Sequence, residues 1–235
     1  MRGEFENRQV VVTGGTGALG GAVVAALLEG GARCVLPWIA EREAEAFPHR
    51  DHERVTLVGP VDLAREEQVA ACYASVERLW ASIHIAGGFA MSALADTSLD
   101  DWRRMQEMNA DTCFLCTREA VKRIRQSGDG GRIVKVAARP ALEPAQGAGM
   151  AAYTASKAAV GAMTQALGAE LAGEGILVNA VAPSIMDTPA NRDGMPDANH
   201  DAWPKLDEVA STICFLASPR NRVTRSGVVP VYGRA

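Results

Sequence analysis

The sequence contains no long apolar run and almost no excess charge. No stretch of its 235 residues is apolar over the roughly 20 positions that span a bilayer, and Met1–Glu6 holds no apolar leader segment. A formal net charge of -4 gives no electrostatic reason to expect nucleic acid or an anionic membrane as a partner. We therefore expect a soluble, cytoplasmic protein whose partner is a small molecule.

Cysteine is sparse, and the chain lacks any break in composition. The five cysteines are odd in number and follow no framework of spacings, which is typical of a reducing compartment. Internal repeats, low-complexity tracts and linkers are absent, and 48% of the residues are hydrophobic, enough for a large core. These features predict one domain over residues 1–235.

One further absence is local. No serine or threonine occurs between Ser127 and Tyr153. A side-chain hydroxyl that could bind a substrate oxygen is therefore missing from residues 128–152.

Short apolar runs rich in β-branched residues alternate with helical patterns along the chain. The runs are continuous, as in a parallel sheet covered on both faces. Their alternation with helices predicts an α/β fold, a single-domain Rossmann-type doubly wound parallel sheet of about seven strands. The predicted strands are Gln9–Thr13, Arg33–Leu36, Arg54–Val58, Ser82–Ala86, Arg132–Ala137, Ile176–Ala182 and Val228–Val231. The predicted helices lie near Ala18–Leu28, Glu66–Trp80, Leu99–Arg125, Gly149–Ala172 and Leu206–Ala217.

Residues 183–205 form the least regular stretch, which is polar and holds four prolines. A long irregular segment inside a compact domain is usually a functional loop or lid. We expect a substrate loop here.

A glycine-rich loop follows the first predicted strand and opens the first predicted helix. It reads Thr13-Gly14-Gly15-Thr16-Gly17-Ala18-Leu19-Gly20. Glycine permits a tight turn and a close backbone approach to a pyrophosphate, and the helix start offers free N–H groups to that anion. The loop predicts dinucleotide binding, against the alternative of a plain strand–helix turn.

Two other strand ends fit the same ligand. Asp62 follows the third predicted strand, where it either accepts the adenine amino group or begins the next helix as its N-cap. Ala86-Gly87-Gly88 ends the fourth, where a ribose could lie against bare backbone. Pro37-Trp38-Ile39 follows the second predicted strand, with Glu41 and Arg42 beyond, so the choice between NAD and NADP stays open.

Tyr153 and Lys157 are one helical turn apart and share a helix face. A nearby ammonium favours the phenolate and lowers a tyrosine pKa from its usual value of about 10. The pair therefore predicts proton transfer beside the dinucleotide.

At this point the chain resembles the short-chain dehydrogenase/reductase family over nearly its whole length. The resemblance is carried by the glycine loop, Asp62, Ala86-Gly87, Asn109, the Tyr153/Lys157 pair, and residues 178–183 and 228–233. It implies that Tyr153 is the general acid/base, that Lys157 lowers its pKa and binds the nicotinamide ribose, and that Asn109 supports a proton relay. Residues matching Pro183, Ile185 and Thr188 border the nicotinamide in that family, while Ala18 and Ser184 replace its usual glycines.

These observations together imply a cofactor of NAD(H) or NADP(H) and a set of residues that contact it. The expected contacts are Gly14, Thr16, Gly17, Ala18, Leu19, Gly20, Trp38, Asp62, Leu63, Ala86, Gly87, Gly88, Tyr153, Lys157, Pro183, Ser184, Ile185 and Thr188.

The sequence departs from the family at the end of the fifth predicted strand. The family usually carries a serine there that holds the substrate oxygen, whereas Ala138 stands at the matching position. Losing one such donor costs about 2.7–4 kcal/mol in an ordinary carbonyl reduction. Arg139, next to it, is either a substrate contact or a solvated arginine beside Pro140.

The dihydropteridine reductase-like branch of the family also lacks this serine. Ala86-Gly87-Gly88-Phe89, Gly149-Met150 and Asp187–Ala198 followed by Trp203 resemble segments of that branch. Against it, the branch has an acid where this chain has Trp38, and it lacks an asparagine like Asn109. A quinonoid pterin is electron-poor, so it accepts hydride with less electrophilic help.

Other motifs favour structural explanations. Cys113 and Cys116 lie inside a predicted helix, away from a helix start, which favours buried packing over redox chemistry. His49, Asp51 and His52 stand in a charged loop without a partner cluster, so no metal site is expected. The helix at residues 149–172 is rich in alanine and glycine on several faces, which favours packing against another subunit, with burial inside one chain as the alternative. The family resemblance implies a homodimer or homotetramer that uses this helix.

We therefore expect an oxidoreductase that passes hydride from a nicotinamide to an electron-poor small molecule, with a quinonoid dihydropteridine as the most specific form of this expectation. Tyr153, Lys157 and Asn109 are the expected catalytic residues, and Phe89, Ala138 and Arg139 the expected substrate pocket. The alternatives are a general carbonyl reductase or alcohol dehydrogenase, and a dinucleotide-binding sensor or scaffold without catalysis.

Overall fold

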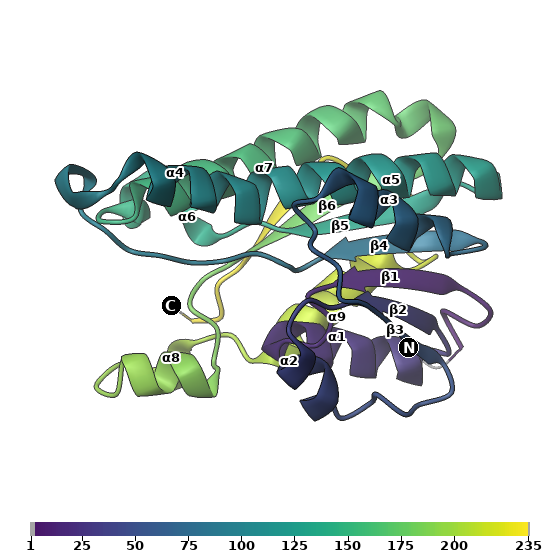
Figure 1. The fold of residues 1–235 in the computed structure, drawn as a ribbon, viewed down its shortest axis with the longest axis horizontal. Helices are drawn as coiled ribbons and strands as arrows, with labels where there is room; N and C mark the ends of the chain where they lie inside the picture. Colours follow the sequence, from purple (N-terminus) through teal and green to yellow (C-terminus); the bar gives the residue numbers. More distant parts are fainter. Residues whose placement is uncertain (1–2, 235) are drawn as a thin grey trace.

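Seven parallel strands form one sheet in the order β3-β2-β1-β4-β5-β6-β7, in a computed structural model that describes residues 3–234 (Figure 1). This order places β1 and β4 at the centre, where the direction of strand addition reverses. The strands are β1 Gln9–Thr13, β2 Arg33–Pro37, β3 Val55–Val58, β4 Leu79–His84, β5 Gly131–Val136, β6 Ile176–Pro183 and β7 Val228–Val231. The predicted Rossmann-type fold is confirmed.

Helices cover both faces of the sheet, as Figure 1 shows. Helices α1 and α9 pack together on one face over the side chains of β1, β2 and β4, and α3, α5 and α7 cover the other. The α-helices are α1 Ala18–Glu29, α2 Glu41–Ala46, α3 Glu66–Ala74, α4 Leu99–Met105, α5 Thr112–Ser127, α6 Arg139–Leu142, α7 Ala151–Glu170, α8 Pro189–Gly194 and α9 Leu206–Ala217. Shorter turns are η1 Leu94–Asp96, η3 Pro144–Gly147, η4 Ala172–Glu174 and η5 His200–Ala202, and η2 Gln106–Asp111 is π-helical.

Burial on both faces explains the continuous apolar strands. Every residue of β6 is buried, and its neighbours β5 and β7 pair with it in parallel register. Because all strands point the same way, their carboxyl ends meet along one edge of the sheet. The glycine loop, the β4 end and the β6 end therefore lie at that edge.

Three element predictions are wrong in their boundaries. The helix predicted over Glu66–Trp80 ends at Ala74, and β4 already starts at Leu79, because this segment pairs with β1 and buries its apolar side chains in the sheet. Consequently β4 ends at His84 rather than at Ala86. The helix predicted over Leu99–Arg125 is interrupted by the π-helical segment η2.

Three short helices were not predicted from the sequence. Helix α2 follows β2, α6 follows β5, and α8 lies inside the expected substrate loop at residues 183–205, together with η5. All three are too short to show a clear 3.6-residue periodicity. Of the helices within residues 3–234, none combines the length and apolar character that crossing a bilayer demands.

Candidate dinucleotide and proton-transfer site

The glycine loop makes a turn that side chains would obstruct. Gly14 has a φ of 67°, and a Cβ there would lie 2.7 Å from the backbone nitrogen of Ala86. A Cβ on Gly20 would overlap the carbonyl oxygen of Gly14. Helix α1 starts at Ala18 without a side-chain cap on Gly17, so its first N–H groups stay free for an anion.

A cavity of about 460 Å³ opens beside this loop, a volume within the usual range for a small-molecule site. It brings together seven of the expected contacts: Gly14, Thr16, Trp38, Asp62, Leu63, Ala86 and Gly87. Its lining also includes Glu43, Met108 and Thr112, which sequence reasoning missed. Glu43 belongs to the unpredicted α2, and the other two sit at the π-helical turn, so periodicity carried no signal for them.

Asp62 organises the turn before α3 rather than capping the helix. Its Oδ1 accepts a hydrogen bond from the Ala64 nitrogen at 2.9 Å, and its own nitrogen donates to Gln68 Oε1 at 2.7 Å. The N-cap of α3 is Arg65, so the N-cap interpretation of Asp62 is wrong. The Asp62 carboxylate lies at the cavity wall, 3.6 Å from Arg65 Nε.

Asn109 joins the end of β4 to helix α7. Its Oδ1 accepts from the Gly88 nitrogen at 3.1 Å, and its Nδ2 donates to the Gly88 oxygen at 3.0 Å and to Ser156 Oγ at 3.1 Å. The side chain is buried, and a Cβ on Gly87 would lie 2.5 Å from its Oδ1. The π-helical segment carries Asn109 inward, so a helix irregularity positions this amide.

Helix α7 places Tyr153 and Lys157 at the same end of the sheet. Lys157 is buried, its Nζ donates to the Val136 oxygen at 3.0 Å, and that nitrogen lies 6.0 Å from the centre of the Tyr153 ring. The Phe89 ring stands edge-on to the Tyr153 ring with 5.0 Å between the centroids. Lys157 therefore links the β5 end to the tyrosine without bonding its hydroxyl directly.

Burial dominates the acid–base properties of this pair. It raises the pKa of Tyr153 to about 12 and lowers the pKa of Lys157 to about 8, the latter opposed by the nearby Cys113 thiol. The expected lowering of the Tyr153 pKa is therefore wrong for the protein by itself, because the ammonium bonds a backbone carbonyl while desolvation disfavours the phenolate. At neutral pH Tyr153 holds its proton and can act as an acid.

The end of β5 is apolar. Ala138 is 5% exposed and precedes α6. Arg139 donates from Nε to Glu143 Oε2 at 2.9 Å, and its guanidinium stacks 4.7 Å from the centre of the Tyr232 ring. Arg139 is held by these protein groups with 28% of its side chain exposed, so both interpretations of it, as a substrate contact and as a solvated arginine, stay predictions.

The segment after β6 is tied down at both ends. Ser184 Oγ donates to the Tyr232 oxygen at 2.9 Å, and Thr188 caps α8 by accepting from the Asn191 nitrogen at 3.1 Å. Asp187 accepts from Arg192 at 2.5 Å and from Lys205 at 2.6 Å, which holds the pKa of its carboxyl well below the usual range. Pro183 ends β6, and the Ile185 side chain beyond it is 45% exposed.

The helical cysteines are packed in the interior. Cys113 and Cys116 are both buried, and burial raises the pKa of the Cys116 thiol. Within residues 3–234 no group of three or more histidine, cysteine, aspartate or glutamate side chains could hold a metal ion.

Comparison with known proteins supplies the context for this geometry. A family model described as short chain dehydrogenase matches residues 8–199. A short-chain type dehydrogenase/reductase from Picea abies is 31% identical over 250 residues, covering 96% of this chain and 91% of that protein. A galactitol 2-dehydrogenase from Rhizobium johnstonii is 34% identical over 243 residues, covering 97% and 94%. A solved structure from Brucella melitensis, titled a short-chain dehydrogenase/reductase of the glucose/ribitol dehydrogenase type, matches with a TM-score of 0.89 and 28% identity, covering 99% and 98%.

Proposed function

The chain belongs to the short-chain dehydrogenase family of NAD(P)-dependent oxidoreductases, and on that basis we propose that it reduces an electron-poor small molecule. The observation that carries the proposal is the contrast between two positions. Tyr153 is a half-buried, protonated acid, while Ala138 offers no hydroxyl to polarise the substrate. A substrate that needs little polarisation matches this pair.

The chain's own residues fit a dinucleotide. Gly14, Gly20 and Gly87 lie so close to neighbouring atoms that a side chain would not fit, and their backbone is therefore uncovered. The cavity extends from the glycine loop to Asp62 and Leu63. The start of α1 would hold the pyrophosphate, Asp62 and Leu63 the adenine, Lys157 the nicotinamide ribose, and the Pro183–Thr188 stretch the nicotinamide. When bound, the cofactor supplies the hydride.

The protein's part in the reaction is proton transfer and orientation. Tyr153 Oη donates its proton to the substrate atom that becomes basic during reduction. The Lys157 ammonium stabilises the phenolate left behind, and Asn109 holds the β4 end against α7 so that the site keeps its shape. Phe89 is an exposed apolar group that stands edge-on to the Tyr153 ring and suits a flat substrate ring.

A quinonoid dihydropteridine is the specific substrate that we propose. Its ring is flat and electron-poor, and the Asp187–Ala198 stretch resembles the corresponding segment of dihydropteridine reductases. An ordinary carbonyl or alcohol couple is the second candidate, supported by the relative named galactitol 2-dehydrogenase.

The test follows oxidation of NADH and NADPH with quinonoid dihydropterin and a panel of ketones. We expect turnover with the pterin, and a loss of roughly 100-fold or more in kcat for Tyr153→Phe. The matched control Tyr232→Phe, which keeps the ring beneath Arg139, retains wild-type turnover. Turnover unaffected by Tyr153→Phe would exclude the proposed acid, and tight cofactor binding without turnover on any substrate would favour a sensor.

A further inference from the structure

The side chain of the residue that follows β2 cannot accept a hydrogen bond from a ribose hydroxyl. In dinucleotide-binding folds an acidic side chain near this place accepts the 2′-hydroxyl of the adenosine ribose, and an arginine there accommodates a 2′-phosphate. Here the position is Trp38, whose indole nitrogen only donates. The Trp38 ring packs against Gly59, where a Cβ would lie 2.7 Å from the ring.

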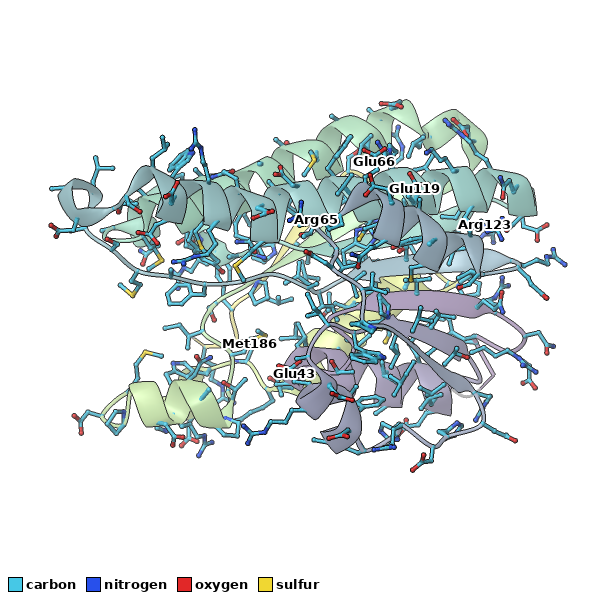
Figure 2. The ribbon with its side chains drawn as sticks, viewed as in Figure 1. Glu43, Arg65, Glu66, Glu119, Arg123 and Met186 are labelled. Carbon is cyan, nitrogen blue, oxygen red and sulfur yellow. The ribbon has the colours of Figure 1, made fainter. Side chains whose placement is uncertain are left out.

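A carboxylate reaches the same region from another element. Glu43 lies in the first turn of α2, and its Oε2 is 3.5 Å from Thr16 Oγ1 in the glycine loop. Both side chains line the cavity beside that loop, together with Trp38. Figure 2 shows Glu43 on α2, apart from Arg65 in this view.

The side chains that line the cavity offer no unpaired cation to the 2′-phosphate of NADPH. Three carboxylates line it, from Glu43, Asp62 and Glu107. Arg65 is the one basic side chain in its lining among the described residues, and it is paired with Asp62. Arg42, the neighbour of Glu43 in α2, is not part of the lining.

We propose that Glu43 is the residue that selects NADH over NADPH, by accepting the ribose 2′-hydroxyl and repelling a 2′-phosphate. The inference rests on the proposed function, since it concerns the cofactor of the same site. The Thr16 hydroxyl lies beside the carboxylate, and Trp38 stands directly after β2, at the position where such folds carry an acid. The selecting carboxylate thus comes from α2.

Cofactor binding without substrate tests this, with the quench of protein tryptophan fluorescence as the readout. We expect wild type to bind NADH at least roughly 10-fold more tightly than NADPH. The Glu43 carboxylate makes a charge-assisted hydrogen bond with the 2′-hydroxyl of NADH and repels the 2′-phosphate of NADPH. Glu43→Gln should reduce that ratio by roughly 10-fold, and Glu43→Ala should do the same. The matched control Glu45→Gln changes a neighbouring exposed carboxylate of α2 outside the cavity lining and keeps the wild-type ratio.

Salt separates electrostatic selection from a structural effect. Raising the ionic strength should narrow the gap between NADH and NADPH for wild type, because it screens the repulsion at the exposed Glu43, but not for Glu43→Gln. A wild-type preference for NADPH, or a ratio unchanged by Glu43→Gln, would overturn the inference. Since substrate is absent, a failure of hydride transfer leaves this result intact, whereas binding of neither nucleotide refutes the proposed function and the inference together.

Discussion

Ala138 and Tyr153 define the chemistry at the scale of single residues. The tyrosine keeps its proton because burial raises its pKa to about 12, and the alanine leaves the substrate oxygen without a side-chain hydroxyl. An electron-poor substrate tolerates this arrangement, whereas an unactivated ketone needs a donor at its oxygen while negative charge develops there.

Ala138→Ser should therefore widen the substrate range. We expect kcat/KM for an unactivated ketone to rise at least roughly 10-fold, since one correctly placed donor contributes about 10²–10³ in comparable sites. NADH binding should not change. The control Ala137→Ser places a hydroxyl one residue away, among the buried side chains of Val160 and Ala180, and gives no gain. Equal ketone activity in Ala138→Ser and wild type would contradict the role of this position.

At the scale of elements, the turn after β4 depends on the π-helical segment η2. Asn109 reaches Gly88 because the irregular helix turns it inward, and Gly87 leaves room for the amide. The sequence marked Asn109, Gly87 and Gly88 as site residues, but only the folded chain shows that they contact one another.

Gly87→Ala should disrupt this contact. The added methyl group would lie 2.5 Å from Asn109 Oδ1 and 3.3 Å from Lys157 Nζ, so one of these groups must move. We expect kcat to fall at least roughly 10-fold, as misplacement of a catalytic group does, and the melting temperature to drop. Gly173→Ala is the control, because its Cβ meets nothing within 4 Å. Wild-type kcat in Gly87→Ala would show that the Asn109 contact does not support catalysis.

At the scale of the whole molecule, a buried polar layer under α5 ties stability to pH. Ser82 Oγ lies 2.7 Å from Tyr73 Oη and 2.8 Å from His84 Nε2. The Nζ of Lys135 is fully buried and has no hydrogen-bond partner among residues 3–234. Burial, and then the charge of Lys135, lower the pKa of His84 to about 3.

This lowered pKa predicts acid sensitivity. Below pH 6.5 the unfolded histidine takes up a proton while the folded one does not, so the free energy of unfolding decreases as the pH falls from 6.5 toward about 3. At pH 5 the loss from this group is roughly 2 kcal/mol. Denaturant unfolding of wild type and His84→Gln at pH 7 and pH 5 measures this loss of unfolding free energy. The variant should lose roughly 2 kcal/mol less than wild type between the two pH values. An equal loss in both proteins would contradict the assignment to His84.

The assembly of the protein is a proposal at the same scale. Helix α7 runs along the outside of its layer, and its outward positions Ala162, Ala166 and Ala169 are exposed and small (Figure 1). We propose a homodimer or homotetramer packed through this face. Light scattering should give two or four times the 24.8 kDa chain mass for wild type and a lower mass for Ala162→Glu. Ala71→Glu on α3 is the control, and a monomeric wild type would contradict the proposal.

The sequence by itself determined the fold class and the position of the glycine loop. Local patterns carry this information: buried strands are continuously apolar, tight turns need glycine, and residues four apart share a helix face. The same local signals failed at the Ala74–Leu79 boundary, where pairing with β1 overrides helical preference.

The tertiary structure alone decided how the site residues meet and what charge they carry. Glu43 of α2 lies beside Thr16 of the glycine loop. Asn109, in the π-helical segment, accepts a hydrogen bond from the Gly88 nitrogen. The pKa values of Tyr153 and Lys157 follow from burial beneath several elements. Desolvation and contacts between distant segments depend on how the whole chain packs, which no local spacing of residues specifies.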